Sequence, residues 1–297
     1  MPDLHRRASV WHERQGLVAE AIEHALAAPD LERAAALIEE GAEATLARSE
    51  ITTLLSWVRR LPDEMVRSRP TLCFFHAWAL LMSGGSLDSI EQSLHDIACA
   101  GDERGGSDEA VDDVLAGRMA ALRGYLNLLQ GDMPGAAELC RRALAHLPES
   151  DLFVRNIVTW ILSLARLFDE DPREVGQALQ AVIQMGQDID NRLVTVTALC
   201  YEAKLQTRQG RLYQAQEILD RAMKLATDAH GRRLPIASEA LMGLGELKRQ
   251  WNDLEAAAGL LGESLELARQ WSELSAFDAY FPLARTRLAQ GDVEAAR

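Results

Sequence analysis

Histidine and cysteine are among the residue types in this chain that could bind a metal or act as bases and nucleophiles. The seven histidines include no pair spaced i, i+4 and no H-E-x-x-H motif, so no helical metal site is indicated. The four cysteines contain no C-x-x-C pair and lie in apolar contexts, which favours small buried residues over zinc ligands or disulfides: Cys73, Cys99, Cys140 and Cys200. No G-x-x-x-x-G-K-[ST] phosphate loop occurs. We therefore expect a non-catalytic segment that carries no cofactor.

A second set of candidates combines charged, hydroxyl and aromatic side chains on predicted helices. Such groups can hydrogen-bond and ion-pair with a small polar effector or with a peptide. The set is Arg118, Tyr125, Lys204, Thr207, Glu246, Arg249 and Arg285, with Glu239 and Asp278 at equivalent positions. Among them Tyr125, Lys204 and Arg249 combine reach with hydrogen-bonding capacity. The alternative is that each is an ordinary solvated helix position.

The helices that would position these residues come from an internal repeat. A small turn residue is usually followed five positions later by alanine, and turns recur at residues 85, 131, 171, 210, 252 and 291, of which those at 85 and 171 are degenerate copies without that alanine. A period near 40 with two helices per unit predicts an all-α protein, an α-solenoid in which each hairpin buries its apolar face against its neighbours. The clearest copies are Gly131 to Ala136, Gly210 to Ala215, Asn252 to Ala257 and Gly291 to Ala296.

Small residues also recur seven positions before the turn, where Gly124, Ala203 and Gly245 stand. We expect the two helices of each hairpin to approach most closely there. The pattern resembles that of the tetratricopeptide repeat, which implies a right-handed superhelix. In such a superhelix the first helix of each hairpin faces the concave side, so the candidate residues are expected to point into a groove.

Two prolines, Pro62 and Pro70, interrupt the helical pattern and suggest a division of the chain. We expect an N-terminal helical arm over residues 1–66 and the superhelix over residues 67–297. The arm is expected to hold helices at 4–15, 17–27, 31–48 and 51–61, with Asp30 and Ser49 as N-caps. The last unit stops inside its second helix, which predicts that the chain is truncated at its C-terminus.

Charge and hydropathy restrict the possible partners. A net charge of -14 and a pI near 5.0 argue against direct contact with nucleic acid. No apolar run approaches the roughly 18 residues of a membrane span, and the first residues are too polar for a signal peptide. We expect a cytoplasmic protein with no membrane contact.

The N-terminal third carries more specific patterns, at residues 4–11, 15–28, 31–38 and 54–62. These stretches resemble the region that follows the ATPase module in large ATP-binding regulators of the LuxR type, the MalT-like transcriptional activators. The resemblance implies a sensor superhelix placed between a nucleotide-binding module and a helix-turn-helix domain. Its partners would be an effector, the other domains of the same regulator or further copies of the chain. The alternative is a generic tetratricopeptide scaffold that binds a peptide or a partner helix.

Overall fold

The computed structural model describes residues 1–103, 109–165, 171–270 and 273–296, and these form sixteen helices. No β-strand occurs in these ranges, where the pairing of Thr227 with Arg233 is an isolated bridge. The all-α prediction is confirmed. The helices are α1 Pro2–Arg14, α2 Val18–Ala27, α3 Leu31–Ala47, α4 Ile51–Val58, α5 Asp63–Arg67, α6 Pro70–Met82, α7 Leu87–Glu103, α8 Glu109–Leu129, α9 Met133–His146, α10 Leu152–Ala165, α11 Pro172–Asp188, α12 Arg192–Arg208, α13 Leu212–Leu225, α14 Ala237–Gln250, α15 Leu254–Arg269 and α16 Glu273–Ala289.

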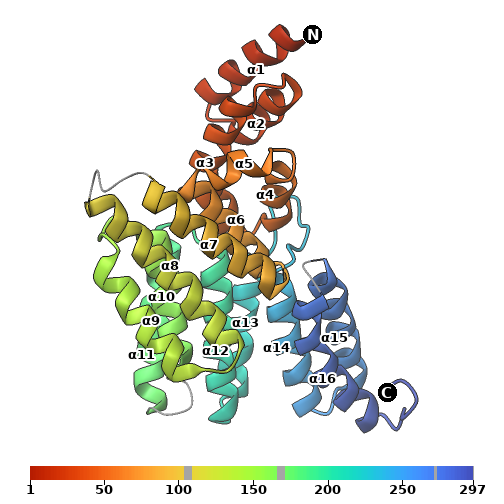
Figure 1. Cartoon of the computed structure of the whole chain (residues 1–297). Helices are drawn as coiled ribbons and strands as arrows, with labels where there is room; N and C mark the ends of the chain where they lie inside the picture. Colours follow the sequence, from red (N-terminus) through yellow and green to blue (C-terminus); the bar gives the residue numbers. More distant parts are fainter. Residues whose placement is uncertain (104–108, 166–170, 271–272, 297) are drawn as a thin grey trace.

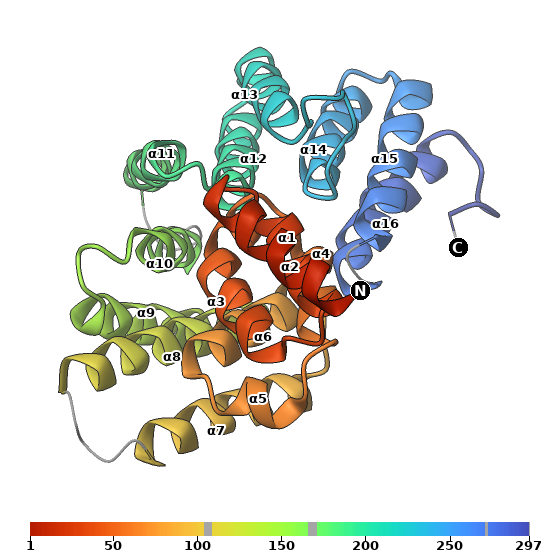
Figure 2. The same ribbon diagram turned by 90° about the horizontal axis from the view of Figure 1, so that it is seen from above.

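From α6 onward the helices form stacked antiparallel hairpins, which gives the molecule its solenoid shape (Figure 1). Each even-numbered helix from α6 to α16 contacts the next even-numbered helix. These helices therefore make one layer, and the odd-numbered helices α7 to α15 make the other. Seen from above, the stack curves around one centre (Figure 2). Helices α8 and α16, which are far apart along the chain, face this centre from different sides.

The small residues of the repeat lie where the helices of a hairpin approach. A Cβ added to Gly124 would stand 2.9 Å from the Cys140 Sγ atom, and one added to Gly245 would stand 2.6 Å from the Leu261 Cγ atom. Side chains larger than hydrogen would push these helices apart. The alanines five residues after the turns are fully buried at Ala136, Ala215 and Ala257.

The helices before these turns end in the same capping motif, in which a residue with positive φ follows the last helical residue. Gly131, Gly210 and Asn252 have φ values of 82°, 75° and 61°. At Gly210 the amide donates to the Thr207 carbonyl at 3.0 Å, while the next amide, of Arg211, donates to the Gln206 carbonyl at 2.9 Å. This pair of bonds satisfies carbonyls that the helix end would otherwise leave unpaired.

The first turn shifts the predicted register by one residue. Gly84, not Gly85, has positive φ (70°), and the Gly85 amide donates to the Leu80 carbonyl at 2.7 Å. Gly85 thus occupies the position after the left-handed residue.

At the end of the last unit, residues 292–296 form no helix, contrary to the expectation, because a single turn cannot offset the unfavourable nucleation of a helix.

Two predicted N-caps do not act as caps. The Asp30 carboxylate makes no capping bond and instead lies 3.7 Å from the Arg6 Nε atom. Ser49 has φ of 66° and its amide donates to the Leu46 carbonyl, so it is the turn residue after α3, and Glu50 precedes α4. Ser49 therefore belongs to the same turn motif as the glycines.

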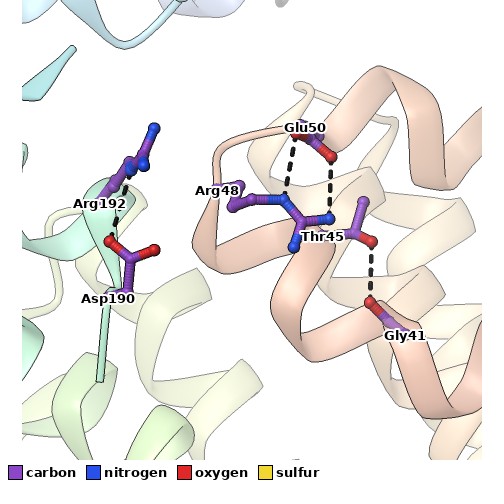
Figure 3. A network of polar contacts seen from close by, with 6 residues as sticks. All are labelled: Gly41, Thr45, Arg48, Glu50, Asp190 and Arg192. Atoms are coloured by element: carbon purple, nitrogen blue, oxygen red, sulfur yellow. Dashed lines mark hydrogen bonds and ion pairs between the residues drawn. The ribbon is translucent and has the colours of Figure 1, made fainter. Parts of the chain in front are cut away.

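Helices α1 to α4 of the arm stand above the superhelix in Figure 1 and lie over the middle of its curve in Figure 2. Helix α3 contacts both α6 and α12, two helices far apart in the sequence. Figure 3 shows the turn after α3, held by Arg48 and Glu50 at 3.2 Å, beside the turn that holds Asp190 and Arg192. The division at residue 66 falls inside α5 and stays a prediction.

Candidate ligand-binding groove

The inner layer of even-numbered helices is hollowed by two adjoining cavities, which together we call the groove. The outer cavity has a volume of about 670 Å³ and the inner cavity one of about 490 Å³. Phe277 and Asp278, on α16, line both cavities. Volumes of this size suit small molecules and short peptides.

The outer cavity brings four of the predicted residues together: Lys204 and Thr207 from α12, Glu246 from α14 and Arg285 from α16. The Arg285 Nη1 atom lies 3.9 Å from the Glu246 Oε1 atom. The Thr207 hydroxyl donates to the Ala203 carbonyl at 2.8 Å and keeps its lone pairs for an incoming donor. The outer cavity therefore presents both signs of charge on an apolar floor.

Lys204 is held by an aromatic face. Its Nζ atom lies 4.4 Å from the centre of the Tyr201 ring, a distance typical of a cation–π contact. Burial lowers the pKa of Lys204, but the negative charge of Glu239 and the effect of Tyr201 outweigh it, so the pKa is raised. The side chain is therefore an ammonium at neutral pH.

Tyr125 lines the inner cavity from α8, with its ring between those of Trp78 and Trp160 at centroid distances of 5.5 and 5.7 Å. The residue is only 9% exposed. Burial, together with the charges of Glu239 and Asp278, raises its pKa, so the phenol stays protonated. It is a hydrogen-bond donor in an aromatic wall.

Arg118 and Arg249 line neither cavity. The Arg118 Nε atom donates to the Asp151 carboxylate at 3.0 Å, and the guanidinium lies 5.4 Å from the Phe74 ring centre. The Arg249 Nε atom donates to Glu246 at 3.0 Å. Each guanidinium is thus held by a carboxylate of the chain itself.

Sequence reasoning missed two aromatic residues of the groove, Phe277 and Phe281, which are 71% and 68% exposed. Large aromatic side chains on a concave surface are typical of binding sites. Their i, i+4 spacing on α16, next to Asp278 and Arg285, was the signal that could have identified them.

A cluster of histidines between α1 and α2 was also not predicted. His5 and His24 face each other with 2.9 Å between their Nδ1 atoms, and the His12 ring stacks on His24 at 5.1 Å. No group of side chains that could hold a metal is found within the described part of the chain.

The cysteines behave as buried apolar residues. Cys73, Cys140 and Cys200 are free and buried, and burial raises the pKa of Cys73 and of Cys140 to about 12. Such thiols are poor nucleophiles and poor ligands. The Cys99 side chain lies outside the described residues.

None of the helices in the described part of the chain is both long and apolar enough to cross a membrane.

The fold and the groove together define an α-solenoid of tetratricopeptide-like hairpins with a hollowed inner face. The sequence profile of the MalT-like TPR region matches residues 117–297, which is more than half of the chain. The chain belongs to the MalT-like TPR family.

Relatives extend the similarity over the arm. The HTH-type transcriptional regulator MalT of Cronobacter sakazakii is 27% identical over 297 residues, which are 100% of this chain and 32% of that protein. MalT of Yersinia pestis is 25% identical over 294 residues, 99% of this chain and 32% of the relative. The chain therefore spans about a third of the length of these regulators.

Two solved structures share the fold. The signal transduction ATPase with numerous domains from Pyrococcus horikoshii, which carries a tetratricopeptide repeat sensor, aligns with a TM-score of 0.62 at 14% identity over 99% of this chain and 45% of its own. A Rap protein complexed with competence and sporulation factor aligns with a TM-score of 0.60 at 13% identity over 95% of this chain and 74% of its own. At these identities the likeness concerns the fold alone.

Proposed function

We propose that this chain is the sensor superhelix of a MalT-like transcriptional regulator, and that it binds a small polar effector or a peptide in the groove without catalysing a reaction. The observation that carries the proposal is the groove itself. Exposed Phe277 and Phe281 lie beside Lys204, Glu246 and Arg285 on its walls. An apolar surface with a few convergent polar groups is the usual composition of a ligand site.

The family supports the regulatory role, and thermodynamics indicates how an effector could act. An effector shifts a regulator between two states only if it binds one of them more tightly. Six successive even-numbered helices form the groove, α6 to α16 in the inner cavity and α12 to α16 in the outer. A ligand that contacts several of them would favour one curvature of the superhelix and so alter contacts with other domains of the regulator or with further copies.

The test is calorimetry of this chain with sugars, short acyl and aromatic metabolites, and peptides, in the absence of ATP. We expect a binder whose affinity falls at least tenfold, about 1.4 kcal/mol, in Lys204→Ala and in Phe277→Ala. The matched control is Lys248→Ala, since Lys248 pairs with Asp253 at 3.7 Å and lines neither cavity. Binding that survives both groove substitutions would refute the groove as the site.

A scaffold that binds a peptide or a partner helix is the second candidate. The exposed aromatic pair on α16 favours it, and the Rap protein of similar fold is complexed with competence and sporulation factor. In the same experiment, a scaffold would bind long peptides and would not bind small metabolites.

We further propose a cytoplasmic location and no direct contact with nucleic acid, in keeping with the net charge of -14.

A further inference from the structure

The inner cavity differs from the outer one in its charge. Among the described residues that line it, the charged ones are both acidic: Glu239 on α14 and Asp278 on α16. Neither carboxylate forms an ion pair or a hydrogen bond within the described part of the chain. The outer cavity, by contrast, contains cations as well as carboxylates: Lys204, Arg208 and Arg285 beside Glu246 and Asp278.

Aromatic rings surround these carboxylates. Tyr125, Trp160, Tyr201 and Phe277 all line the inner cavity. The faces of such rings carry partial negative charge and attract cations, best of all where water is excluded. The chain shows this attraction itself, because the Lys204 ammonium lies over Tyr201.

Two donors of the same wall lack partners, and one of them, the Trp160 indole N–H, is fully buried. The Trp160 indole N–H has no acceptor although the residue is only 7% exposed. The Tyr125 hydroxyl, in a residue that is nine-tenths buried, makes no hydrogen bond within the described ranges. Buried donors without an acceptor are rare in folded proteins. The buried Trp160 N–H therefore favours an occupant that carries a hydrogen-bond acceptor near its charge, and the Tyr125 hydroxyl is available to the same acceptor.

We propose that the inner cavity binds an organic ammonium group, seated between Glu239 and Asp278 on the aromatic walls, with its apolar body against Phe277. The inference rests on the proposed function and names the chemistry of the ligand. Among the described residues that line the inner cavity no side chain is a cation, so the positive charge of a ligand would offset the negative charge of the two carboxylates. A small amine and the free amino terminus of a peptide share this chemistry.

The test compares matched cations and neutral molecules by calorimetry at about 50 mM salt, where attraction between charges is little screened. The small-molecule pair is 2-phenylethylamine and 2-phenylethanol. The peptide pair is Phe-Ala-Ala amide with a free and with an acetylated amino terminus. We expect at least one cation to bind tenfold or more tightly than its neutral partner. The pair that shows the preference identifies the source of the ammonium.

The double variant E239Q/D278N should abolish that preference. Its control is D220N/E255Q, which removes the same two charges from exposed positions on α13 and α15. Equal affinity for a cation and its neutral partner, a preference that survives E239Q/D278N, or no binding of either cation up to about 10 mM would each overturn the inference. A neutral or anionic ligand that depends on Phe277 and Lys204 would leave the groove function standing, so the two failures are distinguishable.

Discussion

Whether a glycine between two packed helices can be replaced depends on the atoms that an added Cβ would meet. In α14, a Cβ on Gly245 would meet the Leu261 side chain at 2.6 Å, whereas one on Gly259 in the facing helix α15 would meet nothing within 4 Å. Gly245→Ala should lower the free energy of unfolding by about 1–3 kcal/mol. Gly259→Ala should raise it by about 0.5–1 kcal/mol through helix propensity. Urea denaturation measures both, and equal effects would contradict this account of the packing.

Glu202 gives a pH-dependent prediction at the same scale. It is 8% exposed, and its Oε2 atom has no partner. Burial raises its pKa above the usual 4.5, against the opposing effect of the hydrogen bond from Gln180. The unfolded chain therefore loses this proton first, and the contribution to stability falls as pH rises above 4.5.

Glu202→Gln cannot lose a proton. The stability of the variant relative to the native chain should therefore rise between pH 4.5 and neutral pH. Denaturation curves of both proteins at several pH values in this range provide the measurement. A constant difference would show that the carboxyl ionises as freely in the fold as in the unfolded chain.

At the scale of elements, Arg118 joins α8 to the start of α10. The side chains of Arg118 and Asp151 are 18% and 4% exposed, and Asp151 also accepts from the Val154 amide at 3.3 Å. Arg118→Ala should destabilise the protein by about 3 kcal/mol, because it leaves a buried carboxylate unpaired. Thermal melting tests this against Lys204→Ala, which should melt like the native chain. If Arg118→Ala kept the native stability and lost ligand affinity, Arg118 would act in binding.

At the scale of the molecule, the C-terminal hairpin should open first. Among the described residues, one core cluster extends from Ala21 to Leu267, whereas α16 packs through a second, small cluster of Leu265, Ala268, Ala276 and Ala279. In a solenoid the stability of a unit depends on its neighbours. Hydrogen exchange should therefore be faster in α16 than in α12. Equal protection of the two helices would show that the groove wall on α16 is as stable as the centre.

The sequence by itself determined the repeat and the family. The turn residues Gly131, Gly210 and Asn252 adopt positive φ, which few residue types tolerate, and Ala136 and Ala257 lie where only small side chains fit. These requirements concern residues close together in the chain. A single sequence therefore displays them as a period, and the period is enough to assign an α-solenoid.

Only the tertiary structure decided which candidates share a cavity. Lys204, Glu246 and Arg285 meet because the superhelix curves α12, α14 and α16 around one hollow, while Tyr125 is buried against Trp160 and Arg118 is held by Asp151. All of these candidate residues occupy equivalent positions on the first helix of a hairpin. What differs is the neighbouring helix that each side chain meets, and that depends on the angles between hairpins, which arise from packing across the whole core.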